Sequence, residues 1–181
     1  PVDGDDATLI RRALSGETEA FSGLVLKYRR SVFAFAASRG LSQTDADDAA
    51  QETFIRAFRF LHTLATADRF PAWLLRIAAN VCNDAMRRTR RAETPLTGEP
   101  SAVIEPSGVP NDDLSDADDR RRVADALAAL DDDHRAVLVM RFIDGKNATE
   151  IAKANGETAG TVRSRIHYAP EKLRRMLDNA R

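Results

Sequence analysis

Apolar residues recur at every third or fourth position along most of the chain, which is the spacing that places them on one face of an α-helix. Before residue 92 this pattern predicts four helices, at roughly 6–14, 17–39, 42–61 and 71–91. No segment shows the alternation of apolar and polar residues that is typical of a half-buried strand. The pattern therefore predicts an all-α fold.

Residues that favour helix ends stand where these patterns begin and stop. Gly40 suits the C-terminal end of the second helix, because glycine adopts the left-handed conformation easily. Ser42 can cap the third helix, with Asp45 three residues on. Pro71 suits a first helical turn, where its missing N–H is not needed.

After residue 119 the helical period resumes and predicts four or five shorter helices. Asn147 and Glu150 form a variant of the capping box that opens one of them, and Gly156 ends it. Thr158 caps the next helix. Pro170 can begin the last helix, because a proline at the first position removes no hydrogen bond.

Between these two regions, residues 92–118 show no helical period and contain no Lys or Arg. Prolines punctuate this acidic stretch, which indicates an extended linker. They are Pro95, Pro100, Pro106 and Pro110. The chain is therefore expected to form two small helical domains, an N-terminal helical bundle at 1–91 and a C-terminal domain at 119–181, joined by a flexible acidic linker at 92–118.

Composition narrows the function further. The formal net charge of −1 over 181 residues hides a basic run at 87–91 and a basic last third, so contact with nucleic acid remains open. Cys82 is the only cysteine, which excludes an internal disulfide, and no Cys/His cluster suggests a metal site. No cofactor is expected. Without a bilayer-length apolar run or a basic leader, the sequence predicts a cytoplasmic protein with no membrane insertion.

The segment from Asn147 to His167 predicts a helix-turn-helix, since a short helix, a turn with Gly156 and a second helix follow one another. In that motif the early residues of the second helix meet base edges in the major groove. Arg163 and Arg165 could donate to guanine edges or to phosphates. The alternative is a solvated basic helix in an all-α domain.

The predicted fourth helix carries a polar and cationic stripe beside its apolar face. A surface that binds single-stranded nucleic acid needs such cations for the phosphates and polar groups for the bases. The apolar face consists of Leu74, Ile77, Ala78, Val81 and Ala85. The stripe consists of Arg76, Asn80, Asn83, Arg87 and Arg91. Trp73, at the start of the helix, is expected to belong to the core rather than to stack on bases.

The predicted third helix buries Ala46, Ala50, Phe54, Ala57 and Leu61 and leaves a charged outer face. That face is either solvated, with Glu52 and Arg56 paired four residues apart, or a docking surface for a partner helix. Periodicity does not choose between the two. No catalytic constellation is present, because the three histidines lie in different predicted elements and Cys82 has no base nearby in the sequence. We therefore do not expect an enzyme.

Three ordered segments resemble the signature regions of bacterial sigma factors, most closely those of the two-domain extracytoplasmic-function (ECF) type of the sigma-70 family. They read DADDAAQETFIRAFRFL, FPAWLLRIAANVCNDAMRR and LDDDHRAVLVMRFIDGKNATEIAKANGETAGTVRSRI. The resemblance covers most of 17–91 and 119–177. It implies a protein that binds core RNA polymerase and directs transcription initiation at promoters with −10 and −35 elements.

The resemblance also implies roles for particular residues. The N-terminal domain would recognise and melt the −10 element through His62, Thr63, Leu64, Arg76, Asn80, Asn83, Arg87 and Arg88. The C-terminal domain would read the −35 element through Thr161, Arg163, Ser164, Arg165 and His167. Polymerase docking would involve Asp48, Gln51, Glu52, Phe54 and Arg56.

The implied partners are promoter DNA, core RNA polymerase and an anti-sigma factor. Polymerase would contribute the clamp coiled coil of its largest subunit and the flap of its second-largest subunit. One departure from the family is Tyr168-Ala169-Pro170, which replaces a basic run after the recognition helix. The alternative function is a stand-alone two-domain helix-turn-helix regulator that binds an operator tightly without polymerase.

Overall fold

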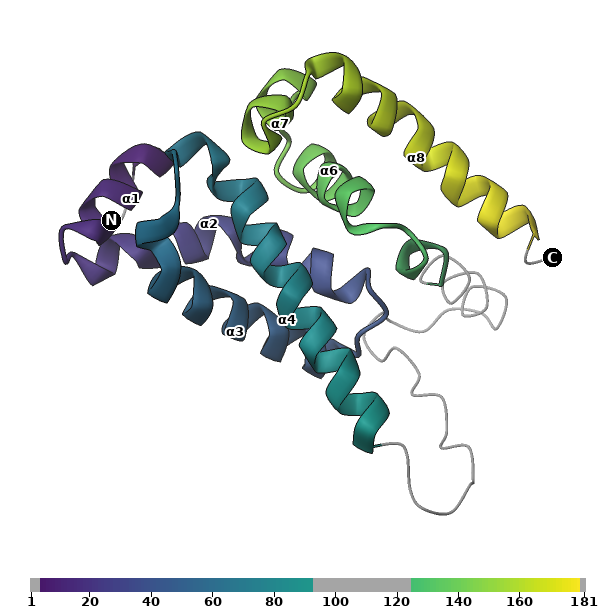
Figure 1. Cartoon of the computed structure of the whole chain (residues 1–181), viewed down its shortest axis with the longest axis horizontal. Coiled ribbons are helices and arrows are strands. Elements are labelled where there is room, and N and C mark those ends of the chain that lie inside the picture. The colour runs from purple at the N-terminus through teal and green to yellow at the C-terminus, as the bar shows by residue number, and fades with distance from the viewer. Residues whose placement is uncertain (1–3, 93–124, 180–181) are drawn as a thin grey trace, which may run out of the picture.

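The computed structural model describes residues 4–92 and 125–179 (Figure 1). In these ranges all regular secondary structure is helical, which confirms the predicted all-α fold. The predicted linker lies outside the described residues except for Ala92. The elements are α1 (Asp6–Leu14), α2 (Thr18–Ala37), α3 (Gln43–Phe60), η1 (Leu61–Thr63), η2 (Ala67–Arg69), α4 (Phe70–Ala92), α6 (Asp132–Phe142), α7 (Ala148–Asn155) and α8 (Ala159–Asn179).

The N-terminal domain is a bundle in which α3 packs against both α2 and α4, while α1 covers one end of α2 (Figure 1). Tyr28, Phe35 and Phe70 are almost completely buried in its core. The Tyr28 hydroxyl donates to Asp6 at 2.5 Å and so ties α1 to α2. Burial raises the pKa of Tyr28 well above its ordinary value, and the Asp6 carboxylate adds to this effect.

The local signals at the helix ends act as the sequence predicts. The Ser42 Oγ accepts a hydrogen bond from the Asp45 N–H at 3.1 Å, and Gly40 has a φ of +84°. Asn147 and Glu150 form the complete capping box of α7. Gly156 ends α7 at a φ of +72°, and Thr158 Oγ1 accepts from the Thr161 N–H at 3.2 Å.

The start of a separate helix at Pro170 was a wrong prediction, because α8 continues through this residue. Pro170 cannot donate to the carbonyl of Ile166, so one hydrogen bond of the helix is lost. Packing holds the remaining turns in place, since Val162 and Ala169 lie seven residues apart on the face of α8 that is buried. The neighbouring proline ring is exposed, so it does not interrupt that contact.

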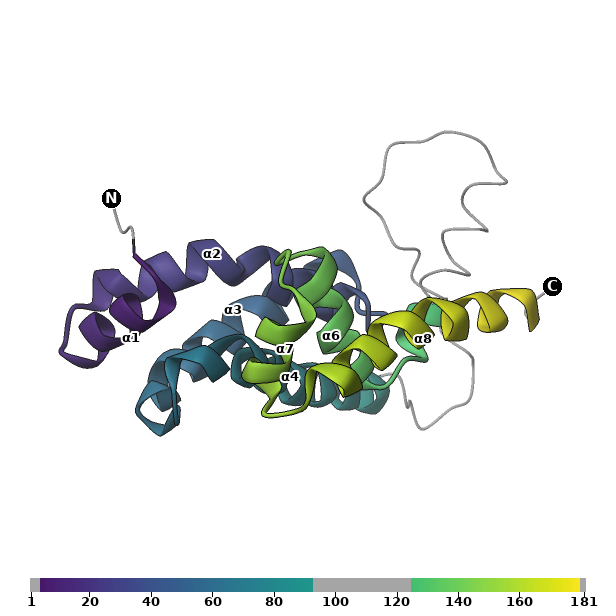
Figure 2. The same ribbon diagram turned by 90° about the horizontal axis from the view of Figure 1, so that it is seen from above.

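The C-terminal domain packs on the N-terminal bundle, with α6 against α2 and α7 against α4 (Figure 2). Arg135 of α6 is only 3 % exposed at this junction. Its guanidinium donates to the carbonyl of Ser38 at the end of α2. Within its own domain it donates to the carbonyls of Leu127 at 2.7 Å, Ala128 at 3.2 Å and Leu130 at 2.5 Å. One side chain thus joins the two domains.

We predict that Arg135→Ala lowers the free energy of unfolding by about 3 kcal/mol, because several buried carbonyls lose their donor at once. Urea denaturation followed by circular dichroism measures the loss. Arg174→Ala, at an exposed position of α8, is the matched control and should change the free energy by less than about 0.5 kcal/mol. Equal effects of the two substitutions would contradict the role assigned to Arg135.

Candidate nucleic-acid and polymerase interfaces

The polar stripe of α4 lies on the surface because the opposite face of this helix is buried. Leu74, Ala78 and Val81 are each at most 1 % exposed and fix the rotation of the helix. Arg76 and Asn80 are therefore exposed, and Asn83 is half-buried. The stripe presents amide and guanidinium donors along one side of the bundle, as the helical period predicts.

The segment between α3 and α4 meets this stripe at a cleft of about 460 Å³. Thr63, Leu64, Arg76, Asn80 and Asn83 all line it, so five residues predicted to act on the −10 element are brought together. His62 is exposed on the same segment, in η1, but does not line the cleft. The cleft offers apolar surface and hydrogen-bond donors to an unstacked base. Asp132, Asp133 and Glu157 of the C-terminal domain line its other side.

Trp73 packs against the hydrophobic core, as expected, and it also lines this cleft. It is half-buried, and its ring centroid lies 5.9 Å from that of Phe70. Phe70 is completely buried and anchors the end of the loop. Trp73 therefore has a supported ring at the edge of the cleft, an arrangement that allows stacking against a base.

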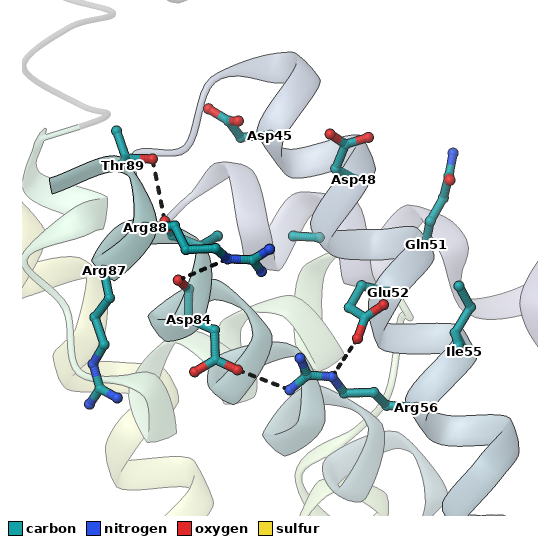
Figure 3. A pocket seen from close by; sticks show the side chains of 12 residues that line it. Asp45, Asp48, Gln51, Glu52, Ile55, Arg56, Asp84, Arg87, Arg88 and Thr89 are labelled. Atoms are coloured by element: carbon teal, nitrogen blue, oxygen red, sulfur yellow. Dashed lines mark hydrogen bonds and ion pairs between the residues drawn. The ribbon is translucent and has the colours of Figure 1, made fainter. Parts of the chain in front are cut away.

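Arg87 and Arg88 lie further along α4 and do not line this cleft. They line a groove between α3 and α4 instead, together with Asp48 and Gln51 (Figure 3). Figure 3 shows Arg88 turned toward the helix backbone, where its Nε donates to the Asp84 carbonyl at 3.4 Å. The structure thus divides the residues predicted for the −10 element between two adjacent surfaces.

An ion-pair network crosses the floor of the α3–α4 groove (Figure 3). Arg56 donates to Glu52 at 2.7 Å and to Asp84 at 3.0 Å. These hydrogen bonds, with Glu52 the stronger influence, raise the pKa of Arg56 above its ordinary value. The contact between Arg56 and Asp84 therefore joins α3 to α4, and Glu52 orients Arg56 from the same helix. Asp48 and Gln51 of α3 are exposed.

A second groove runs along the other side of α3, against α2, and its lining is mainly apolar. Leu26 is 67 % exposed and Ile55 is 48 % exposed at its edges. Phe54, predicted to take part in docking, is 8 % exposed and lines the same groove. The sequence analysis did not select Leu26 and Ile55. Their large apolar side chains outside the inward face of each helix were the signal that could have found them.

The ridge of α3 separates these two grooves. Gln51 and Ile55 line both of them. We name this surface the α3 ridge and define it by Asp48, Gln51 and Ile55. It combines a carboxylate, an amide and an exposed aliphatic group, which is a suitable composition for contact with another protein.

In the helix-turn-helix, α8 leaves Thr161, Arg163, Ser164 and His167 exposed, while Val162 is completely buried against the domain. Arg165 differs from the expectation of a free DNA-reading side chain. Its Nη1 donates to both carboxylate oxygens of Glu157, at 2.8 Å and 2.7 Å. Glu157 in the turn therefore holds the Arg165 guanidinium against the C-terminal domain. Arg141, which the sequence analysis did not select, lines a pocket together with Arg163 and His167.

The described residues give little support for a metal site or for a reactive cysteine. No group of three or more His, Cys, Asp or Glu side chains in residues 4–92 and 125–179 could hold a metal ion. Cys82 is completely buried, and burial raises the pKa of its thiol to about 11. No helix in the described part of the chain is both long and apolar enough to cross a membrane.

Comparison with known proteins agrees with this geometry. Residues 24–92 match the sigma-70 region 2 family and residues 126–175 match the sigma-70 region 4 family. The chain is 33 % identical to the RNA polymerase sigma factor CarQ of Myxococcus xanthus, over 93 % of this chain and 95 % of CarQ. It is also 33 % identical to the sigma factor CnrH of Cupriavidus metallidurans, over 96 % of this chain and 94 % of CnrH.

The solved structure of CnrH in complex with the cytosolic domain of CnrY is similar over 96 % of this chain and 97 % of that chain, with a TM-score of 0.63 and 32 % sequence identity. The matched regions include α3, the stripe of α4 and the helix-turn-helix, in that order. The similarity extends over nearly the whole chain rather than over one motif. The chain therefore belongs to the ECF group of the sigma-70 family of RNA polymerase sigma factors.

Proposed function

We propose that this chain is a promoter-specificity subunit that binds core RNA polymerase and directs it to promoters with −10 and −35 elements. The observation that carries the proposal is the cleft at which Trp73 and the loop before α4 meet Arg76, Asn80 and Asn83. A helix-turn-helix regulator has no need of such a cleft. Nor does it need the α3 ridge on the same domain.

The domains divide the work by the form of DNA that they meet. Residues 1–91 bind the −10 element and polymerase, and residues 119–181 bind the −35 element as a duplex. Residues 92–118 connect the two. The chain itself performs no chemical step, since RNA synthesis takes place at the polymerase. Its contribution is to select the site and to assist strand opening.

At the −10 element the cleft captures a base that has left the duplex. Unstacking a base costs a few kcal/mol, which stacking and hydrogen bonds in a fitted pocket can offset. Trp73 offers the stacking surface, and the Asn80 amide offers a donor and an acceptor. Arg76 supplies positive charge for the neighbouring phosphate.

At the −35 element α8 enters the major groove. Arg163 is exposed in the second turn of the helix. In this proposal its guanidinium donates two hydrogen bonds to a guanine edge. Thr161 and Ser164 supply shorter contacts to bases or phosphates. Arg165 contributes less than its charge suggests, because Glu157 already occupies its guanidinium.

The α3 ridge is the proposed contact for the clamp coiled coil of the largest polymerase subunit, and the C-terminal domain meets the flap of the second-largest subunit. An inhibitory protein of the anti-sigma class is part of the same proposal. The solved CnrH chain, similar over nearly its full length, is bound to the cytosolic domain of a second protein, CnrY. The stand-alone regulator is not favoured, because nearly full-length similarity joins this chain to RNA polymerase sigma factors.

Mixing the full chain with bacterial core RNA polymerase and applying the mixture to gel filtration tests the proposed function. The expected result is co-elution, followed by specific initiation on a mapped promoter. Tight duplex binding by the free chain, without co-elution, would support the stand-alone regulator instead.

We predict that Ile55→Arg weakens binding to core polymerase at least about tenfold, because a charge would have to be desolvated on the α3 ridge. Titration of labelled polymerase with the variant measures the affinity. Leu14→Arg is the matched control, since Leu14 of α1 is 53 % exposed, against 48 % for Ile55, but lies in neither groove. Loss of binding by both variants would argue against the ridge.

We predict that Asn80→Ala reduces the open fraction of promoter complexes about tenfold, equivalent to about 1.4 kcal/mol of capture energy. Asn80 is exposed, so the fold should be unaffected. Permanganate footprinting of unpaired thymines reports opening, and co-elution with polymerase serves as the control. A bubble of normal intensity would contradict the assigned role.

We predict that Arg163→Ala reduces discrimination between bases at one position of the −35 element by about tenfold, the usual range for a lost bidentate contact. Arg165→Ala is the matched control, because its guanidinium is held by Glu157 and should contribute little to base discrimination. Affinity measurements on single-base variants of the element separate the two. Uniform weakening across all variants would assign Arg163 to a phosphate instead.

A further inference from the structure

The first helix, α1, packs behind the loop of residues 61–69 that forms one side of the α4 cleft. It contacts both η1 and η2 of this loop, and Figure 1 shows α1 beside the segment that leads into α4. Leu9 and Ile10 of α1 are buried in the same hydrophobic cluster as Leu61 and Phe70, on either side of the loop. The position of the loop therefore depends on α1, although α1 itself does not line the cleft.

A row of three aromatic rings leads from α2 to the cleft. The centroid of the Tyr28 ring lies 5.4 Å from that of Phe70, and the Phe70 centroid lies 5.9 Å from that of Trp73. Both pairs are tilted, and both separations lie in the range in which aromatic rings attract one another. Tyr28 is 2 % exposed and Phe70 is completely buried. Of the three rings, only Trp73 lines the cleft.

The other end of the row is fixed by Asp6, in the first turn of α1. The Asp6 Oδ2 accepts a hydrogen bond from the Tyr28 hydroxyl at 2.5 Å, and the Asp6 Oδ1 accepts one from Lys27 Nζ at 2.6 Å. The Asp6 side chain is only 17 % exposed. Hydrogen bonds to a carboxylate are among the stronger ones in proteins. This one holds the Tyr28 hydroxyl at α1 and so limits displacement of the ring.

Stacking on a base depends on how firmly the Trp73 ring is held. A ring that samples several orientations loses more conformational freedom when it binds, and this loss weakens the capture of a base. Side chains of a binding site are precise when neighbouring residues lock their rotamers. Phe70 supplies that support to Trp73, and Phe70 in turn packs against Tyr28.

We propose that Asp6 and Tyr28 are positioning residues for base capture, which act on the −10 element through Phe70 and Trp73 without touching DNA. The inference rests on the function proposed above and adds residues of α1 and α2 to its machinery. In this view α1 supports the loop from behind. The hydrogen bond between Asp6 and Tyr28 fixes α1 in that position.

Tyr28→Phe tests the proposal, because it removes the hydroxyl and leaves the ring in place. We expect complexes of this variant with core polymerase and promoter DNA to open about fivefold less, the effect of one ordinary side-chain hydrogen bond. Permanganate footprinting measures opening, and the affinity for core polymerase should be unchanged. Asp6→Ala removes the acceptor and should give the same loss. Asp6→Asn keeps an acceptor oxygen and should retain most of the opening.

Glu19→Ala is the matched control for Asp6→Ala. Both residues are acidic and lie in the first turn of a helix, so both substitutions remove the same favourable interaction with the helix dipole. Glu19 is exposed and lines neither the cleft nor the two grooves beside α3. Its replacement should therefore leave opening unchanged. Equal losses from both substitutions would assign the effect to helix stability and reject the positioning role.

A double-mutant cycle tests whether Tyr28 acts through Trp73. Trp73→Leu removes the stacking ring and should reduce opening by itself. If Tyr28 only positions that ring, Tyr28→Phe causes no further loss in the Trp73→Leu background. Losses that multiply would show that Tyr28 affects opening by another route, and the proposal would then be wrong.

The fluorescence of Trp73 provides a second readout in the free chain, since Trp73 is the only tryptophan. Tyr28→Phe and Asp6→Ala should increase the quenching of this fluorescence by acrylamide, because the ring is held less firmly. Glu19→Ala should not change it, and circular dichroism should show the same helix content in all variants. Unchanged quenching in Tyr28→Phe, together with reduced opening, would also contradict the proposal.

These measurements separate the inference from the function on which it rests. If the wild-type chain does not co-elute with core polymerase, the proposed function fails, and the quenching of Trp73 still decides whether Asp6 and Tyr28 hold its ring. If Tyr28→Phe opens promoters as well as the wild type does, the proposed function stands and the positioning role is rejected.

Discussion

A buried guanidinium stands at the centre of the contact between the two domains, beside a shared apolar cluster. Arg135 donates to carbonyls near the end of the helical segment that precedes α6 and to the carbonyl of Ser38 at the end of α2. Burial lowers its pKa, but an arginine keeps its charge in proteins. The charge is compensated by carbonyl dipoles and by Asp132 at 3.5 Å. Arg135 thus fixes α6 against the end of α2, and α6 in turn forms the second wall of the cleft at α4.

Local signals explain why so much of the fold could be predicted. Ser42, the Asn147–Glu150 capping box and Gly156 act within a few residues of themselves, so their effect is visible in the sequence. The buried faces of α3 and α4 follow the helical period for the same reason. Pro170 misled because its local preference was overruled by packing of α8 against α6, which the local sequence does not contain.

Features that depend on distant partners escaped prediction. Arg135 meets Ser38 across 97 positions, and nothing around it in the sequence marks it as buried. Arg165 looked free because its partner, Glu157, lies across the turn, where only the fold brings the two side chains together. The α4 cleft was partly predictable, since its amide and arginine residues follow a stripe. Its acidic wall was not, because it belongs to the other domain.

The α3 ridge has a consequence for how partners exchange. Gln51 and Ile55 line the grooves on both sides of α3, so a protein seated in either groove covers side chains that the other groove also needs. Two such proteins cannot occupy the ridge together. Which of the two proteins is bound then depends on their concentrations and affinities, because both need the same side chains of the α3 ridge.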